Sequence, residues 1–223
     1  MQLVSNYKKA EFCADCHQLG SPFPGLELEV PFINTYNQWK DGPYSKKGVT
    51  CQNCHMPGGD HTWRGGHDPD MVRRAVSVSV STDKENYSAG ETGTATVKIT
   101  NIGAGHKFPT GGSGGNARMV ILKNSIVGED GNAIAGDQTV IMRTMKEPPP
   151  LANMAMELSD NRIDPGEERI IQNTYSFPTG VTRKLFLRTT LEYHLFPQPA
   201  LQAFGLAEAL PPVVIYDGKK PLN

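Results

Sequence analysis

The sequence predicts a mainly β protein built from two unlike parts, an irregular N-terminal region with short helices and an antiparallel β region. Residues 1–70 are rich in Pro and Gly and show little periodicity, whereas strict alternation of apolar and polar residues begins at Ala75. Six or more short alternating runs follow, without convincing helices between them, which is typical of an immunoglobulin-like β-sandwich. We therefore expect two domains, residues 1–72 and 73–223.

Only short helices fit the N-terminal region, because proline and glycine interrupt it repeatedly. We expect one helix around Asn6–Cys16. A second is expected over Pro31–Asp41, where Phe32, Tyr36 and Trp39 recur at helical spacing. The region offers few apolar side chains for a core of its own, so bound groups must take the place of a core, as metals do in other small domains.

In the β region, strands are expected wherever the alternation runs unbroken. In chain order the predicted strands are Ala75–Ser81, Thr94–Thr100, Ala117–Leu122, Thr139–Met145, Arg169–Ser176 and Lys184–Glu192. Turn clusters such as Asp164–Glu167 separate them. A helical alternative exists only near Leu151–Leu158 and Ala200–Ala209.

All four cysteines of the chain lie in two copies of the motif C-x-x-C-H. The copies are Cys13-Ala-Asp-Cys16-His17 and Cys51-Gln-Asn-Cys54-His55. This motif attaches c-type haem: both thiols bond to the haem vinyl groups, and the next histidine becomes the proximal iron ligand. The sequence therefore predicts two haem c groups, with His17 and His55 bound to iron. The alternative is a zinc site made from both cysteine pairs, although zinc ribbons require no histidine after each pair.

Four further histidines are candidates for the sixth iron ligand. His61 and His67 follow the second motif within a loop's reach of it, and either is equally compatible with a solvated loop residue. His106 lies in a glycine-flanked turn, and glycine lets a backbone approach a flat macrocycle closely. His194 follows a strand, where a structural or exposed role is expected. The residue pattern alone leaves these alternatives open.

Three segments together carry a resemblance to a known family. In chain order they are Gly48–Pro57, His61–Gly65 and Gly105–Gly111. Their sequences resemble the multihaem c-type cytochromes of bacterial respiratory and extracellular electron-transfer chains, over most of residues 10–115. The resemblance implies that His61 and His106 are the distal iron ligands. Relatives often carry a histidine just before the Gly-Val-x-Cys stretch; because this chain has none there, His67 stays in reserve as a distal ligand.

The resemblance implies a dihaem c-type cytochrome that carries out one-electron transfer with no catalytic residues of its own. Redox proteins would be its partners, including other multihaem cytochromes or further copies of the chain. One alternative is a multihaem oxidoreductase in which one iron keeps an open position for substrate. Another is a haem-bearing assembly module of a larger cytochrome complex or filament. Whether the chain is an enzyme stays open, with an electron carrier expected.

Charge and hydropathy limit which partners and which cellular location the chain can have. The net charge is −1 and no basic face stands out, so we expect no nucleic-acid partner. No apolar run approaches the ~20 residues of a membrane span. The segment Met1–Lys9 lacks the apolar stretch and cleavage site of a secretory signal. Because haem c is attached outside the cytoplasm, the motifs nevertheless predict a periplasmic or extracellular protein.

Overall fold

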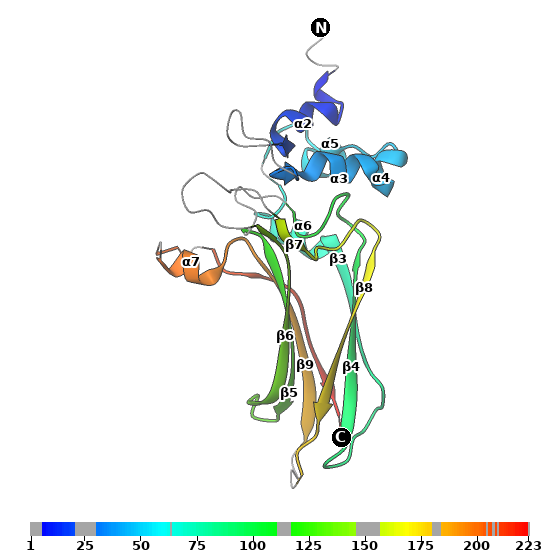
Figure 1. Cartoon of the computed structure of the whole chain (residues 1–223), viewed down its shortest axis with the longest axis vertical. Helices are drawn as coiled ribbons and strands as arrows, with labels where there is room; N and C mark the ends of the chain where they lie inside the picture. Colours follow the sequence, from blue (N-terminus) through cyan, green and yellow to red (C-terminus); the bar gives the residue numbers. More distant parts are fainter. Residues whose placement is uncertain are drawn as a thin grey trace.

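The computed structural model describes residues 6–20, 30–62, 64–110, 117–145, 157–179, 184–203, 205–206, 208 and 210–222. The chain is mostly β, with short helices gathered at one end of long sheets (Figure 1). The helices are α2 (Glu11–His17), α3 (Thr35–Asp41), α4 (Pro43–Lys46), α5 (Cys51–His55), α6 (Pro69–Ala75) and α7 (Gln198–Ala203). The strands are β1 (Gln18–Leu19), β2 (Ile33–Asn34), β3 (Val76–Thr82), β4 (Thr92–Asn101), β5 (Met119–Gly128), β6 (Ala133–Met145), β7 (Glu157–Asp160), β8 (Glu168–Ser176), β9 (Leu185–His194) and β10 (Val213–Pro221).

The strands form three antiparallel sheets. The largest has the order β10-β9-β5-β6-β7, the second has the order β3-β4-β8, and β1 pairs with β2 alone. Strand β5 pairs on one side with β6 and on the other with β9, so Met119 lies opposite both Met142 and His194. This register fixes which side chains share a face of the sheet.

The main core lies between the two larger sheets. Val97 and Ile99 of β4, Leu122 of β5, Ile141 of β6 and Leu191 of β9 are almost fully buried there and belong to one apolar cluster. Their alternation with more exposed residues along each strand is what the period-two pattern requires. Burial of these side chains supplies most of the hydrophobic stabilisation of the chain.

The N-terminal helices have almost no core of their own. Among the described residues before Val72, only Ala10 and Met56 have buried apolar side chains. These helices are instead held against the end of the sheets by polar contacts. Arg143 of β6 donates hydrogen bonds to the carbonyl oxygens of Pro31 and Phe32, at 2.9 and 3.1 Å. In the described part of the chain, no helix is long and apolar enough to cross a membrane.

The fold class expected from the sequence was wrong. We expected an irregular dihaem region joined to an immunoglobulin-like β-sandwich, whereas the structure has three separate sheets, one of them within the N-terminal part. The described residues of that part show no helical dihaem domain; they form short helices and the β1–β2 pair. Alternation along single strands does not report which strands pair, and two-residue strands are too short to alternate at all.

The individual strands predicted from the sequence agree with the structure better than the predicted fold class does. All six predicted strands overlap observed ones, although Ala117–Leu122 covers only the start of β5; β1, β2, β7 and β10 were not predicted. In β10, charged residues interrupt the apolar run, which hides the strand from a pattern search. The helical alternative near Leu151–Leu158 lies largely outside the described residues. The expected domain boundary at 72/73 falls inside α6, and the division into two domains stays a prediction.

Candidate functional site

Each C-x-x-C-H motif occupies a short helix, α2 or α5. Residues three and four apart lie on the same helical face, so the two cysteines and the histidine of each motif point the same way. Helix α5 begins with a capping box in which Thr50 and Asn53 bond reciprocally across the first turn. The local sequence therefore sets the orientation of Cys51, Cys54 and His55.

The two motifs lie side by side. The thiols of Cys13 and Cys51 are within hydrogen-bonding distance of one another. Gln52 of α5 donates to the carbonyl oxygens of Tyr7 and Lys9, both at 2.8 Å, which fastens α5 to the chain before α2. Burial, followed by the neighbouring Cys13 thiol, raises the pKa of Cys51 to about 12. All four cysteines are free thiols in this structure.

The imidazole rings of His55 and His106 lie near one another and are nearly parallel. Their ring centroids lie 6.2 Å apart and their planes differ by 22°. His55 Nδ1 lies 2.7 Å from the Arg64 carbonyl oxygen, and His106 Nδ1 lies 3.0 Å from that of Lys107. A carbonyl only accepts, so each Nδ1 carries the proton and each Nε2 keeps a free lone pair.

That spacing fits a metal ion held between two imidazoles. Metal–imidazole bonds are about 2 Å long and a ring centroid lies about 1.1 Å behind its bonding nitrogen, so two opposed ligands place their centroids about 6 Å apart. The Nδ1–H bonds to backbone carbonyls are the outer contacts that metal-bound histidines usually make. His55 and His106 therefore have the donor atoms and the separation of an axial ligand pair.

The turn that carries His106 is held by Asn101, a fully buried residue at the end of β4. Its Nδ2 donates to the carbonyl oxygens of His106 at 3.0 Å and Ile163 at 3.1 Å, and its Oδ1 accepts from the Ala104 N–H at 3.1 Å. At Gly103 a β carbon would lie 2.1 Å from the Arg74 carbonyl oxygen, so only glycine fits this close approach.

Burial lowers the pKa of His106 to about 4. The hydrogen bond to Lys107 acts in the opposite direction, and the charges of His55, Arg162 and His17 lower it further. Only the neutral imidazole can donate its lone pair to a metal. At neutral pH, His106 is therefore in the ligating form.

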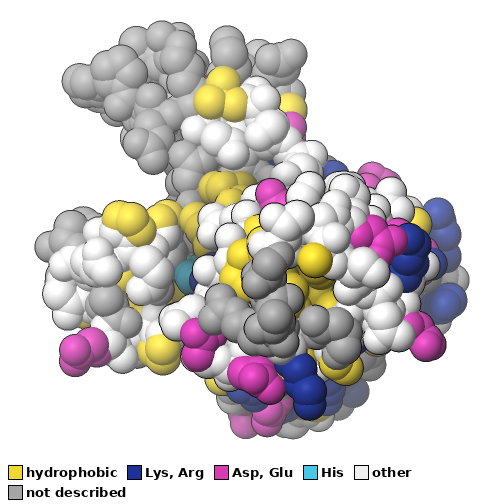
Figure 2. All heavy atoms as spheres, turned by 90° about the horizontal axis from the view of Figure 1, so that it is seen from below, with side chains coloured by type: hydrophobic (Ala, Val, Ile, Leu, Met, Phe, Trp, Pro, Cys, Tyr) yellow, Lys and Arg dark blue, Asp and Glu magenta, His cyan; other side chains and the backbone are white. Residues whose placement is uncertain are grey.

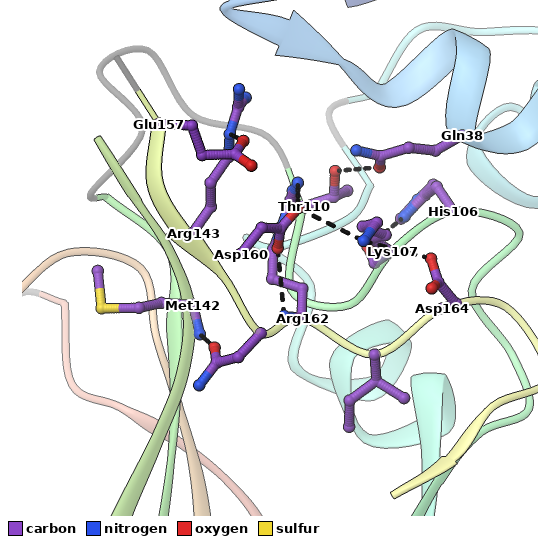
Figure 3. Close-up of polar contacts among 12 residues, drawn as sticks. Gln38, His106, Lys107, Thr110, Met142, Arg143, Glu157, Asp160, Arg162 and Asp164 are labelled. Carbon is purple, nitrogen blue, oxygen red and sulfur yellow. Dashed lines mark hydrogen bonds and ion pairs between the residues drawn. The ribbon is translucent and has the colours of Figure 1, made fainter. Parts of the chain in front are cut away.

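A network of charged side chains lies beside the His106 turn (Figure 3). Arg162 donates two hydrogen bonds of 2.8 Å to Asp160, and Lys107 lies 3.5 Å from both Asp160 and Asp164. Burial alone would raise the pKa of Asp160, but the bonds and charge of Arg162 outweigh it and lower the pKa to about 2. Asp160 is therefore ionised at neutral pH.

The other candidate ligands, His17, His61 and His67, are all exposed residues. His17 has its pKa lowered by burial first and then by the charges of His55 and His61, which places these three histidines in one neighbourhood. The side chains of His17 and His61 reach the surface. His67 is exposed at the start of α6, and none of the contacts described for this chain links it to His17 or His55. Trp63, between these loop histidines, lies outside the described residues.

The sequence search missed Asn101, Gln52 and Arg143. Asn101 ends a strand, where an asparagine is usually part of a turn, and only its complete burial distinguishes it. Arg143 lies within an alternating strand, and its side chain is only 7 % exposed. A polar residue at an inward position of a strand is the one signal that marks Arg143 in the sequence.

Comparison with solved structures finds a similarity to a multihaem cytochrome. A penta-haem cytochrome c552 from Thermochromatium tepidum matches with a TM-score of 0.73 and 26 % identity, over 96 % of this chain and 56 % of that chain. The chain thus spans a little over half the length of that cytochrome. A sporulation control protein of Bacillus subtilis (TM-score 0.29, 13 % identity, 66 % of this chain and 48 % of that one) and a Bacteroides uniformis β-glucuronidase (TM-score 0.29, 12 % identity, 65 % and 12 %) are too distant to inform function.

No family model and no curated protein sequence matches the chain. The likeness to the cytochrome covers both the short helices with the C-x-x-C-H motifs and the β region, since it extends over nearly all of this chain. The fold is therefore similar to that of a multihaem cytochrome c.

Proposed function

We propose that this protein is a c-type cytochrome that transfers single electrons outside the cytoplasm and holds two covalent haems. The observation that supports this most strongly is the pair of imidazoles of His55 and His106. Their ring centroids lie 6.2 Å apart, and both Nδ1 atoms are hydrogen-bonded to carbonyl oxygens. The similarity to a penta-haem cytochrome over nearly the whole chain points the same way.

The donor sets fit haem c at both motifs. For one haem, Cys51 and Cys54 supply the thioether sulfurs, and His55 and His106 the axial nitrogens. For the other, Cys13 and Cys16 supply the sulfurs and His17 the proximal nitrogen. His61 is its proposed distal ligand because its charge acts on His17, with His67 as the reserve. When bound, haem c supplies a one-electron Fe(III)/Fe(II) couple.

The protein's own residues tune and protect that couple. The carbonyls of Arg64 and Lys107 orient the two imidazoles and increase their basicity as ligands. Phe108, two residues after His106, is 6 % exposed and packs on Tyr193 in the main core, which ties the His106 turn to the sheets. Because the Cys13 and Cys51 thiols lie close together, the two motifs would hold their haems near one another and would supply two neighbouring one-electron centres in one chain.

Partners and location follow from the same proposal. The chain would exchange electrons with other redox proteins, including multihaem cytochromes or further copies of itself. It would act in the periplasm or at the cell exterior, where haem c is attached. The region that carries the motifs and the β region act as one unit, because His106 belongs to the β region.

The test is to produce the chain in a host that attaches haem c and to weigh it under denaturing conditions. We expect the 24.3 kDa polypeptide plus two haem masses. A polypeptide mass alone, or one that carries zinc, would refute the proposal.

The ligand assignment is tested by His106→Ala, with His67→Ala as the matched control. We expect His106→Ala to convert one of the two haems to the high-spin form, raise its potential and open it to CO, because one axial nitrogen is lost. His61→Ala should do the same to the other haem. Loss of low-spin haem in His67→Ala but not in His106→Ala would move the ligand to the loop, and high-spin haem in the unchanged protein would indicate an open catalytic site.

A further inference from the structure

His194, the last residue of β9, has a side chain that is only 6 % exposed. Within the part of the chain that the structure describes, neither of its ring nitrogens makes a hydrogen bond of normal geometry. Glu192 Oε2 lies 3.5 Å from Nε2, too far for a normal hydrogen bond, and Lys123 already binds that carboxylate at 2.9 Å. An unsatisfied buried imidazole in a native protein calls for an explanation, and a bound ion is one of the few available.

Two thioethers share a row of the sheet with His194. Met119 of β5 is paired with His194 on one side and with Met142 of β6 on the other. Directly paired residues in neighbouring strands point to the same face. The next residues, Tyr193 and Ile141, belong to the core, so the Met142–Met119–His194 row lies on the opposite, outer face of the sheet.

The row is compact enough for a single ion. Neighbouring strands lie about 4.8 Å apart, so an ion above the middle strand is within reach of both flanking side chains. Figure 3 shows the Met142 side chain directed away from the Asp160 and Arg162 network. In the space-filling view, one small histidine patch lies among mostly white and yellow atoms (Figure 2).

The donor atoms of this row favour some metal ions over others. Thioether sulfur and imidazole nitrogen are soft donors that favour Cu(I), whereas Ca(II) and Mg(II) require oxygen ligands. Burial lowers the pKa of His194, against the raising effect of Glu192, so the ring is neutral at pH 7. We propose that Met119, Met142 and His194 form a binding site for Cu(I), separate from the C-x-x-C-H motifs.

The experiment uses the haem-loaded protein under argon, titrated with Cu(I) supplied as a coloured bis-chelate whose absorbance falls as copper leaves it. Haem occupies the motif histidines, which removes them from competition. We expect one Cu(I) per chain, and an affinity at least tenfold lower in Met119→Leu, Met142→Leu and His194→Gln. Leucine nearly conserves the volume of methionine, so these variants keep the fold.

Met71→Leu, which changes a methionine of α6 away from the row, is the matched control and should bind as the unchanged protein does. X-ray absorption at the copper edge should show sulfur neighbours at about 2.3 Å together with nitrogen at about 2 Å. The proposal is overturned if the row variants bind copper as tightly as Met71→Leu does. It is equally overturned if the bound copper has no sulfur neighbour, or if His67→Ala abolishes the binding.

Discussion

Asn101→Asp should make the stability of the His106 turn depend on pH, because the side chain of residue 101 becomes titratable. The new carboxyl keeps the shape of the amide but faces the carbonyl oxygens of His106 and Ile163, to which Asn101 now donates at 3.0 and 3.1 Å. Because position 101 is fully buried, burial and the two carbonyls raise the pKa of the carboxyl in the folded state. A rise of roughly 2–3 units corresponds to about 3–4 kcal/mol.

The sign of this effect follows from linkage. A carboxyl whose pKa is raised on folding favours the folded state only while it is protonated, so stability is lost as pH rises from about 4 through the folded-state pKa. Denaturant unfolding of the haem-loaded protein at pH 4.5 and 7.5 measures the difference from the unchanged chain. We expect a loss of about 3 kcal/mol at pH 7.5 and much less at pH 4.5.

Gln172→Glu is the matched control, because it makes the same amide-to-acid change on the exposed side of β8. It should show no comparable pH dependence. Equal stability of Asn101→Asp and the unchanged protein at pH 7.5 would refute the role of Asn101 as an anchor. A loss of the same size at both pH values would refute the assigned direction of its hydrogen bonds.

Three further predictions concern charge, attachment and haem-dependent folding. The pKa of Asp160 is lowered to about 2 in the folded protein, so the stabilisation by its carboxylate is fully present above the unfolded pKa near 4 and is lost as pH falls towards 2. Asp160→Asn should therefore lower the free energy of unfolding by about 2 kcal/mol at pH 7, measured by denaturant unfolding. An unchanged free energy of unfolding would contradict this. Arg143→Met removes the hydrogen bonds to Pro31 and Phe32 and leaves the Glu157 carboxylate without its arginine. It should lower the free energy of unfolding by about 3 kcal/mol and speed amide hydrogen exchange in residues 30–36. Unchanged exchange in these residues would contradict the prediction. Changing all four cysteines to Ala should leave residues 72–222 resistant to protease and make residues 6–68 sensitive. The reason is that almost all buried apolar side chains lie in residues 72–222. Protection of both segments would show that residues 6–68 fold without haem.

The sequence predicted the strands better than their arrangement. Ala75–Ser81 alternates strictly because one face of β3 is buried and the other meets water, so the pattern records burial directly. The fold class was nevertheless wrong, since pairing between strands distant in sequence leaves no local trace. Strand β5 contacts β9 across more than fifty intervening residues, and the two-residue strand β1 carries no pattern to detect.

For the candidate site, the sequence by itself determined the donor atoms. Spacing within C-x-x-C-H fixes two thiols and an imidazole on one helical face, because a helical turn brings residues three and four apart together. Such local chemistry can be read from the chain without knowing how the chain folds. It also named His61, His67 and His106 as candidates for the sixth ligand, and the family resemblance preferred His61 and His106 with His67 in reserve.

Only the tertiary structure decided which of these histidines faces which. His106 is more than fifty residues beyond His55. Their ring centroids lie 6.2 Å apart because Asn101 shapes the turn after β4 and the Tyr44 hydroxyl of α4 donates to the Ile102 carbonyl oxygen in that turn. The row of Met119, Met142 and His194 arises in the same way, because the distant strand β9 pairs with β5 of the β5–β6 hairpin. Long-range pairing sets such distances, since it depends on the burial of whole sheets and not on any short segment.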